Sequence, residues 1–244
     1  MNARDATDEV DATPSDIGPL VDAPRDSRAD ANDDGSLDGA TPDGLSGRVV
    51  FDKYNGQLNI PSRSDQIGIV GGASTLTDEN GSYVLAATPD VDLLLLASLP
   101  GEISVQRALR LPSTRESIDL HVIDIDAYVG TVNRLGGDID AFSFGMVAVR
   151  FRGATRTGYG ATISATHGGS FVFTPPDGFG TAVASDTTRA ADDSIYFYAV
   201  TPGTTTLTVT SPSGAAPCVD RYPPSTRVYP VTVGTFTEIV LQCP

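Results

Sequence analysis

Short runs of β-branched, aliphatic and aromatic residues recur from Gly47 to the end of the chain, about a dozen residues apart, with turn-forming residues between them. Several of these runs alternate apolar and polar positions. In residues 206–210, Leu207 and Val209 fall on one face and the threonines on the other. A period of two residues is typical of a strand with one buried and one solvated face, and a helical period is weak throughout. The pattern therefore predicts an all-β chain.

The runs form two series that are similar to each other. The first predicts strands at residues 48–51, 66–70, 82–87, 92–98, 104–111 and 117–125, and the second at 128–133, 144–152, 161–166, 170–174, 194–200, 204–210, 227–233 and 236–242. Segments of the first series recur in the same order in the second: 47–50 in 130–132, 80–85 in 168–173, 94–101 in 207–214 and 117–123 in 237–243. The growing spacing between matches predicts an insertion near residues 175–193. We therefore predict two tandem β-sandwich domains, at residues 47–126 and 127–244.

The first domain carries a local motif around a tight turn. It opens with a Gly-x-Val at Gly47 and continues with Thr77-Asp-Glu-Asn-Gly-Ser-Tyr-Val-Leu, whose Asn80-Gly81 corner tolerates positive φ. This motif resembles that of carboxypeptidase-regulatory-like or transthyretin-like domains. The resemblance covers most of residues 47–126, and residues 127–244 follow it more loosely.

The resemblance implies immunoglobulin-like or transthyretin-like β-sandwiches, and the alternation after the turn places Tyr83 and Leu85 on one face of a strand. It also implies a non-catalytic accessory or surface role. The second domain departs from the motif, because Gly168 and Gly169 stand where the acid of the turn is expected and the insertion follows them.

Residues 1–46 differ in composition from the rest of the chain. They hold 12 of the 31 acidic residues and three arginines, so their net charge is −9, whereas the rest of the chain carries −6. They are rich in Asp, Ala, Pro, Gly and Ser, and such a segment cannot bury enough apolar surface to offset its ordering entropy. We predict a disordered acidic linker here. The acidic charge also excludes nucleic acid and anionic lipid as expected partners.

The two cysteines, Cys218 and Cys243, lie close together near the end of the chain and predict a local disulfide. A disulfide indicates an oxidising, extracytoplasmic compartment, which in a bacterium means the periplasm, the outer surface or the medium. No apolar run approaches the roughly 18 residues of a transmembrane helix. The residues after Met1 are polar and carry no export signal. We expect that a signal segment was removed or lies upstream. In that case the chain could carry a lipid anchor.

The acidic linker contains part of a calcium-loop pattern. Asp30, Asn32, Asp34 and Asp38 occupy positions that carry oxygen ligands in such loops, but Thr41 stands where a bidentate acid is required. We expect a weak calcium site at most, and the sequence predicts no other cofactor.

A second candidate site is an aromatic triplet in the second domain. Alternation in Tyr196-Phe197-Tyr198 places Phe197 in the core and both tyrosines on the opposite face, where they could form a ligand platform. The alternative, in which the tyrosines cover a sheet face or pack on the inserted loop, stays open. His121 alternates with apolar neighbours and is expected to be an ordinary exposed or hydrogen-bonded strand residue.

These observations predict a non-enzymatic, extracytoplasmic bacterial surface protein that serves adhesion or structural assembly, with a protein or a glycan at the cell surface as partner. No Walker loop, dinucleotide-binding motif, zinc-protease motif or Gly-x-Ser-x-Gly nucleophile elbow occurs in the sequence. A carbohydrate- or small-ligand-binding accessory domain is the alternative, and a hydrolase is a third possibility.

Overall fold

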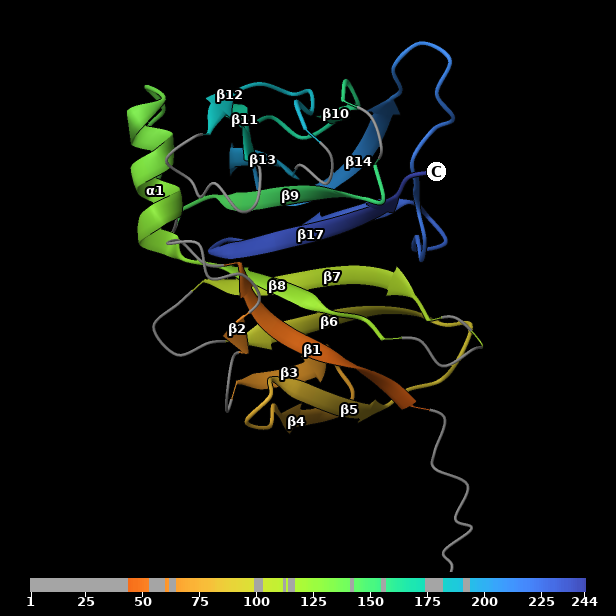
Figure 1. Ribbon diagram of the computed structural model, residues 1–244. Coiled ribbons are helices and arrows are strands. Elements are labelled where there is room, and N and C mark those ends of the chain that lie inside the picture. Colours follow the sequence, from red (N-terminus) through yellow and green to blue (C-terminus); the bar gives the residue numbers. More distant parts are fainter. Residues whose placement is uncertain are drawn as a thin grey trace, which may run out of the picture. The chain divides into compact units, whose positions relative to one another are not determined.

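The computed structural model describes residues 44–52, 60–61, 65–98, 103–111, 113, 117–140, 143–154, 157–173, 182–190 and 194–244. These residues belong to one compact unit that spans residues 41–244. Strands dominate this unit, as the alternating sequence pattern predicts, and the fold is all-β with a single helix among the described residues (Figure 1).

The elements follow one another in the order β1 (Gly44–Asp52), β2 (Ile60–Pro61), β3 (Gln66–Ile69), β4 (Ser74–Leu76), β5 (Ser82–Ala86), β6 (Asp92–Ser98), β7 (Ser104–Arg110), β8 (Leu120–Ile123), α1 (Ile125–Arg134), β9 (Gly145–Arg152), β10 (Gly160–Ile163), β11 (Gly169–Phe173), β12 (Val183–Ala184), β13 (Ser194–Val200), β14 (Gly203–Thr210), β15 (Val219–Asp220), β16 (Val228–Val231) and β17 (Thr235–Gln242). Below, the N-terminal half means residues 44–123 and the C-terminal half means residues 145–244.

The C-terminal strand β17 joins the two halves within one sheet. This ten-stranded sheet has the order β12-β11-β13-β9-β17-β7-β6-β3-β4, with β15 also paired to β17. Strand β17 is parallel to β9 on one edge and to β7 on the other, with Ile239 opposite Val149 and Phe236 opposite Val105. This sheet therefore contains strands from both sides of residue 126, where we predicted the boundary between two sandwiches. The division of the chain into two domains stays a prediction.

Two smaller sheets complete the fold. Strand β1 pairs with β5 and β2 in antiparallel fashion and with β8 in parallel, and β10, β14 and β16 form an antiparallel sheet in the C-terminal half. Each half thus begins and ends on a parallel pair, β1 with β8 and β9 with β17. The counterpart of β1 in the C-terminal half is therefore β9.

The strand predicted at residues 128–133 is wrong, because this segment lies in helix α1. The side chain of Asp124 caps the first turn by accepting a hydrogen bond from the Ala127 amide (3.0 Å). At the other end of the helix, Gly136 adopts a φ of 81°. The Gly136 amide donates to the Asn133 carbonyl and the Gly137 amide donates to the Val132 carbonyl (3.0 Å each). These two hydrogen bonds form a Schellman motif, which ends a helix at a glycine. Within the described residues, no helix is long and apolar enough to cross a membrane.

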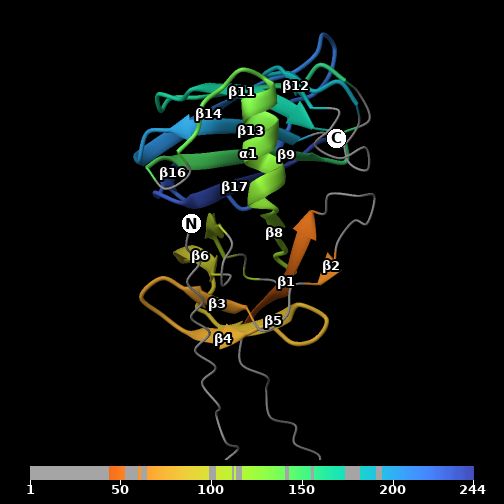
Figure 2. The same ribbon diagram turned by 90° about the vertical axis from the view of Figure 1, so that its left-hand side faces the viewer.

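Helix α1 covers one face of the ten-stranded sheet (Figure 2). Its residue Tyr128 has no exposed surface and contacts rings from three strands, with centroids 5.6 Å from Phe171, 6.4 Å from Tyr196 and 4.8 Å from Phe236. The Tyr128 hydroxyl donates to the carbonyl of Phe197 (3.3 Å). Buried side chains of the N-terminal half continue the same apolar cluster, so this core spans both halves.

The other predicted strands are confirmed, with ends that shift by a few residues. Tyr83 and Leu85 are both buried, and Gly81 adopts a φ of 70° at the predicted corner. Leu207 and Val209 are half-buried, and the threonines between them are exposed. The sequence pattern missed β2, β4, β12 and β15, because strands of two or three residues carry no readable period. Residues 44–46, which we placed in the linker, are the start of β1.

Only glycine fits at position 47, because β1 and the segment before β8 approach each other closely here. A Cβ at this position would lie 2.0 Å from the carbonyl oxygen of Ile118. The hydroxyl of Tyr83 donates to that same carbonyl (2.5 Å). The Gly-x-Val and the Tyr of the sequence motif therefore meet at one point, beside the start of β8.

Replacing Tyr128 by alanine should lower the free energy of unfolding by about 3–5 kcal/mol, because the substitution empties a buried aromatic site. Urea denaturation of the purified chain measures this loss. The matched control is Asn133→Ala on the exposed side of the same helix, which should change stability by about 0.5 kcal/mol or less. Equal effects of the two substitutions would show that α1 does not pack on the sheet as described.

Candidate functional site

The structure confirms the predicted disulfide between Cys218 and Cys243, which are 25 residues apart in the sequence. The bond ties the segment before β15 to the residue that follows β17. The proposed calcium ligands Asp30, Asn32, Asp34 and Asp38 lie outside the described residues, so calcium binding stays a prediction.

The prediction of an exposed platform formed by Tyr196 and Tyr198 is wrong for Tyr196, which has no exposed surface. Phe197 is buried as well, on the opposite face. The reason is helix α1, whose residue Tyr128 covers the face on which Tyr196 lies. Tyr198 is half-buried, and its ring packs closely against the glycine backbone at residues 137, 168 and 169. The tyrosines therefore cover a sheet face, which is the alternative considered above.

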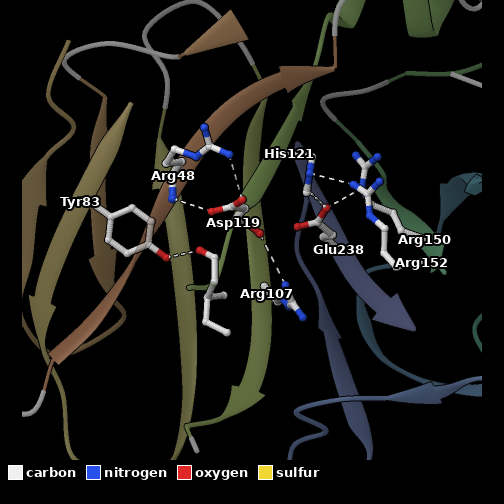
Figure 3. Close-up of polar contacts among 9 residues, drawn as sticks. Arg48, Tyr83, Arg107, Asp119, His121, Arg150, Arg152 and Glu238 are labelled. Carbon is white, nitrogen blue, oxygen red and sulfur yellow. Dashed lines mark hydrogen bonds and ion pairs between the residues drawn. The ribbon is translucent and has the colours of Figure 1, made fainter. Parts of the chain in front are cut away.

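A buried ion cluster lies where the two halves meet (Figure 3). Its centre is Glu238 on β17, whose side chain is 1% exposed. Arg150 on β9 donates from Nε to Glu238 Oε1 (2.5 Å), and His121 Nδ1 lies 2.7 Å from the same oxygen. In the parallel register Glu238 lies opposite Ala148, so Arg150, two residues further along β9, projects from the same face.

His121 connects this cluster to a second arginine. Arg152 donates from Nη2 to His121 Nε2 (2.9 Å). Because an arginine only donates hydrogen bonds, Nε2 acts as the acceptor, and the proton donated to Glu238 is on Nδ1. His121 is a buried strand residue with both ring nitrogens bonded, which confirms the expectation from the sequence.

The carboxyl group of Glu238 is held in its ionised form. Burial alone would raise its pKa, but the contacts with His121 and Arg150 outweigh burial and hold the pKa well below its usual range. A buried carboxylate beside a buried guanidinium is strongly coupled to its partner, because removal of either one leaves an uncompensated charge. The cluster therefore fixes β17 of the C-terminal half to β8 of the N-terminal half.

A further set of polar contacts surrounds Asp119, just before β8. Its carboxylate accepts from the Arg48 amide (2.9 Å) and the Ser117 hydroxyl (3.1 Å), and it lies 3.6 Å from the Arg48 guanidinium. The backbone carbonyl of Asp119 lies 3.5 Å from Arg107 Nη1 (Figure 3). Asp119 thus holds two arginines that come from different strands, β1 and β7.

Between these two sets of contacts lies a cleft of about 330 Å³. Both halves contribute to it, and many of its side chains are charged or polar. The lining residues are Arg48, Val50, Arg107, Ser117, Ile118, Asp119, His121, Arg152, Arg221, Tyr222, Val240 and Gln242.

The sequence analysis did not identify this site. One signal was present, since Glu238 and Arg150 are charges of opposite sign that stand next to aliphatic or aromatic residues in strand runs. Their proximity follows only from the parallel pairing of β17 with β9, which local patterns do not encode. Within the described ranges, no group of three or more His, Cys, Asp and Glu residues is placed to hold a metal ion.

The sequence matches no protein-family model and no curated protein sequence. Solved structures that align with 82% of the chain include the major pilin protein of Streptococcus pyogenes, at 8% identity over 97% of that protein with a TM-score of 0.26. A carbohydrate-binding module from Eubacterium rectale, in complex with maltoheptaose, aligns at 9% identity over 93% of its length with a TM-score of 0.25. The minor pilin of Streptococcus agalactiae aligns at 12% identity over 96% of its length with a TM-score of 0.24. TM-scores this low do not establish a common fold.

Replacing Glu238 by glutamine should lower the free energy of unfolding by about 3–5 kcal/mol, because it removes the carboxylate that balances the buried charge of Arg150. The midpoint of urea denaturation at pH 7 measures the effect. Glu79→Gln makes the same chemical change at an exposed position and should alter stability by about 0.5 kcal/mol or less. A loss of similar size in both variants would contradict the role given to the buried cluster.

The contribution of Glu238 should also depend on pH. Because its pKa is lower in the folded than in the unfolded chain, the stabilisation is complete above the unfolded pKa of about 4.3 and is lost as the pH falls toward the folded value. The stability difference between the native chain and Glu238→Gln, as measured by denaturation, should therefore shrink as the pH falls below about 4. A difference that grows at acid pH would reverse the assigned sign.

Proposed function

We propose that the chain is a non-catalytic, extracytoplasmic module of a bacterial surface that serves adhesion or structural assembly. The observation that carries this proposal is the pairing of β17 with β9 in one half and β7 in the other. This strand ends next to Cys243, whose disulfide to Cys218 secures the same segment. A sheet that continues from one half into the other, and whose strand β17 is secured by a disulfide, suits a stiff structural element.

Further contacts between the halves support the same role. The amide and hydroxyl of Ser225, in the C-terminal half, both bond the carboxylate of Asp92 on β6 (2.9 Å each). Arg110 Nη1 on β7 donates to the Ser225 hydroxyl (2.8 Å). Polar contacts on this surface thus add to the buried cluster around Glu238 in resisting motion between the halves.

The extracytoplasmic location is inferred from the disulfide, since such bonds form and persist mainly in oxidising compartments. The non-catalytic role is inferred from the buried cluster. His121 and Arg150 both bond Glu238 through short contacts, so these titratable groups stabilise the junction between the halves. Residues 1–43 would serve as the spacer between this module and the surface that carries it.

A small-ligand-binding role is the second candidate, and the observation that favours it is the cleft beside His121. The tyrosine platform that first suggested ligand binding is not exposed, because Tyr196 is buried. A ligand site at the cleft is compatible with a structural role for the sheet.

The location and the bond are tested together by isolating the chain from cell-envelope and cytoplasmic fractions of its own bacterium. Non-reducing mass spectrometry should find the chain in the envelope fraction with Cys218 and Cys243 joined. Reduction should then lower the free energy of unfolding by about 3 kcal/mol, and it should have no effect on a Cys218→Ser, Cys243→Ser double variant. Free thiols in a cytoplasmic chain, or clear turnover in a broad hydrolase screen, would overturn the proposal.

A further inference from the structure

The cleft beside His121 gathers positive charge on an acidic protein. Four arginines line it, namely Arg48, Arg107, Arg152 and Arg221, and Asp119 is the one acidic residue in the lining. The whole chain has 16 basic residues and a net charge of −15. A quarter of all its cations therefore converge on one small concave site of a chain in which acidic residues are in excess.

Among the residues that line the cleft, positive charges outnumber negative ones. Asp119 pairs with Arg48, and it can neutralise one of the four arginines. Glu238, behind His121, is matched by the buried Arg150, which is not part of the lining. Like charges held together at a concave surface repel one another, and an anion bound among them relieves this repulsion.

Tyr222 supplies an independent observation. It is 9% exposed and lines the cleft, and its buried hydroxyl has no hydrogen-bond partner among the described residues. A buried hydroxyl without a partner is costly, and a ligand with an acceptor oxygen would satisfy it.

The segment that carries Tyr222 is held in place before any ligand arrives. The Tyr222 amide donates to Asp220 Oδ1 (3.0 Å), and its carbonyl accepts from the Arg110 amide (3.1 Å). The guanidinium of Arg221 lies 5.3 Å from the centre of the Tyr222 ring. Positions fixed in advance reduce the entropy lost on binding.

We propose that this cleft binds an oxyanion, that is, a carboxylate, sulfate or phosphate group carried by a small ligand. Guanidinium groups present paired N–H donors that match the two oxygens of such a group, and these charge-assisted hydrogen bonds are among the strongest in proteins. The Tyr222 hydroxyl adds a neutral donor. The cleft volume of about 330 Å³ is at the lower end of the range for ligand pockets, which suits a small ligand. This binding activity goes beyond the structural role proposed above and does not depend on it.

The test is isothermal titration calorimetry of the full chain in a low-salt buffer free of other oxyanions. The probes are inorganic phosphate, sulfate and glucuronate, with neutral glucose as the matched control for the sugar. We expect saturable binding of at least one anion and none of glucose. The anion that binds most tightly identifies the class of group.

Variants then assign the binding to the cleft. Arg48→Gln and Arg221→Gln change exposed side chains, and each should weaken binding about tenfold or more through loss of a charge-assisted hydrogen bond. Arg189→Gln is the control, because Arg189 is an exposed arginine outside the lining. Tyr222→Phe should weaken binding without lowering the stability of the unliganded chain, since it removes a hydroxyl that lacks a partner.

Three results would overturn the proposal. The first is no binding of any of the three anions up to about 10 mM. The second is equal binding of glucose and glucuronate. The third is an affinity that Arg48→Gln and Arg221→Gln leave unchanged, or that Arg189→Gln lowers as much as they do. Either outcome would mean that the arginines of the cleft are only a solvated charged surface.

Discussion

The parallel pairing of β17 with both β9 and β7 is the constraint on which the rest of the fold depends. It unites two series of strands in one sheet and places the buried carboxylate of Glu238 at the junction of the halves. Because the strand is paired on both edges, its backbone donors and acceptors find partners within the sheet, as a central strand requires. The disulfide, the ion cluster and the shared apolar core all lie on or beside this strand.

Strand positions could be predicted from the sequence because they follow from a local period of two. Runs such as residues 194–200 and 92–98 match β13 and β6 at both ends. The disulfide was also predictable, since only one pairing of two cysteines exists. Sheet order was not, because the pairing of β17 with β7 joins residues more than a hundred positions apart, and nothing local in either run specifies the partner.

Two errors in the sequence analysis share one physical cause. Residues 128–133 contain Tyr, Val and Thr, which favour a strand over a helix by propensity. The prediction of a strand therefore left out the cap at Asp124 and the helix end at Gly136 and Gly137. Without a helix there, nothing covered the sheet face that bears Tyr196, which therefore looked exposed. Tertiary packing decides both points: the helix buries its own Tyr128 and Tyr196 together.

The place of β17 in the sheet also bears on the order in which the molecule can assemble. Strand β17 lies between two strands that precede it in the chain, so until β17 has been made the edges of β7 and β9 that it will occupy stay unpaired. Exposed edges of this kind invite aggregation in a crowded cell. Because Cys243 directly follows β17, the sheet and the disulfide to Cys218 are completed by the same segment, and neither can form before that segment is present.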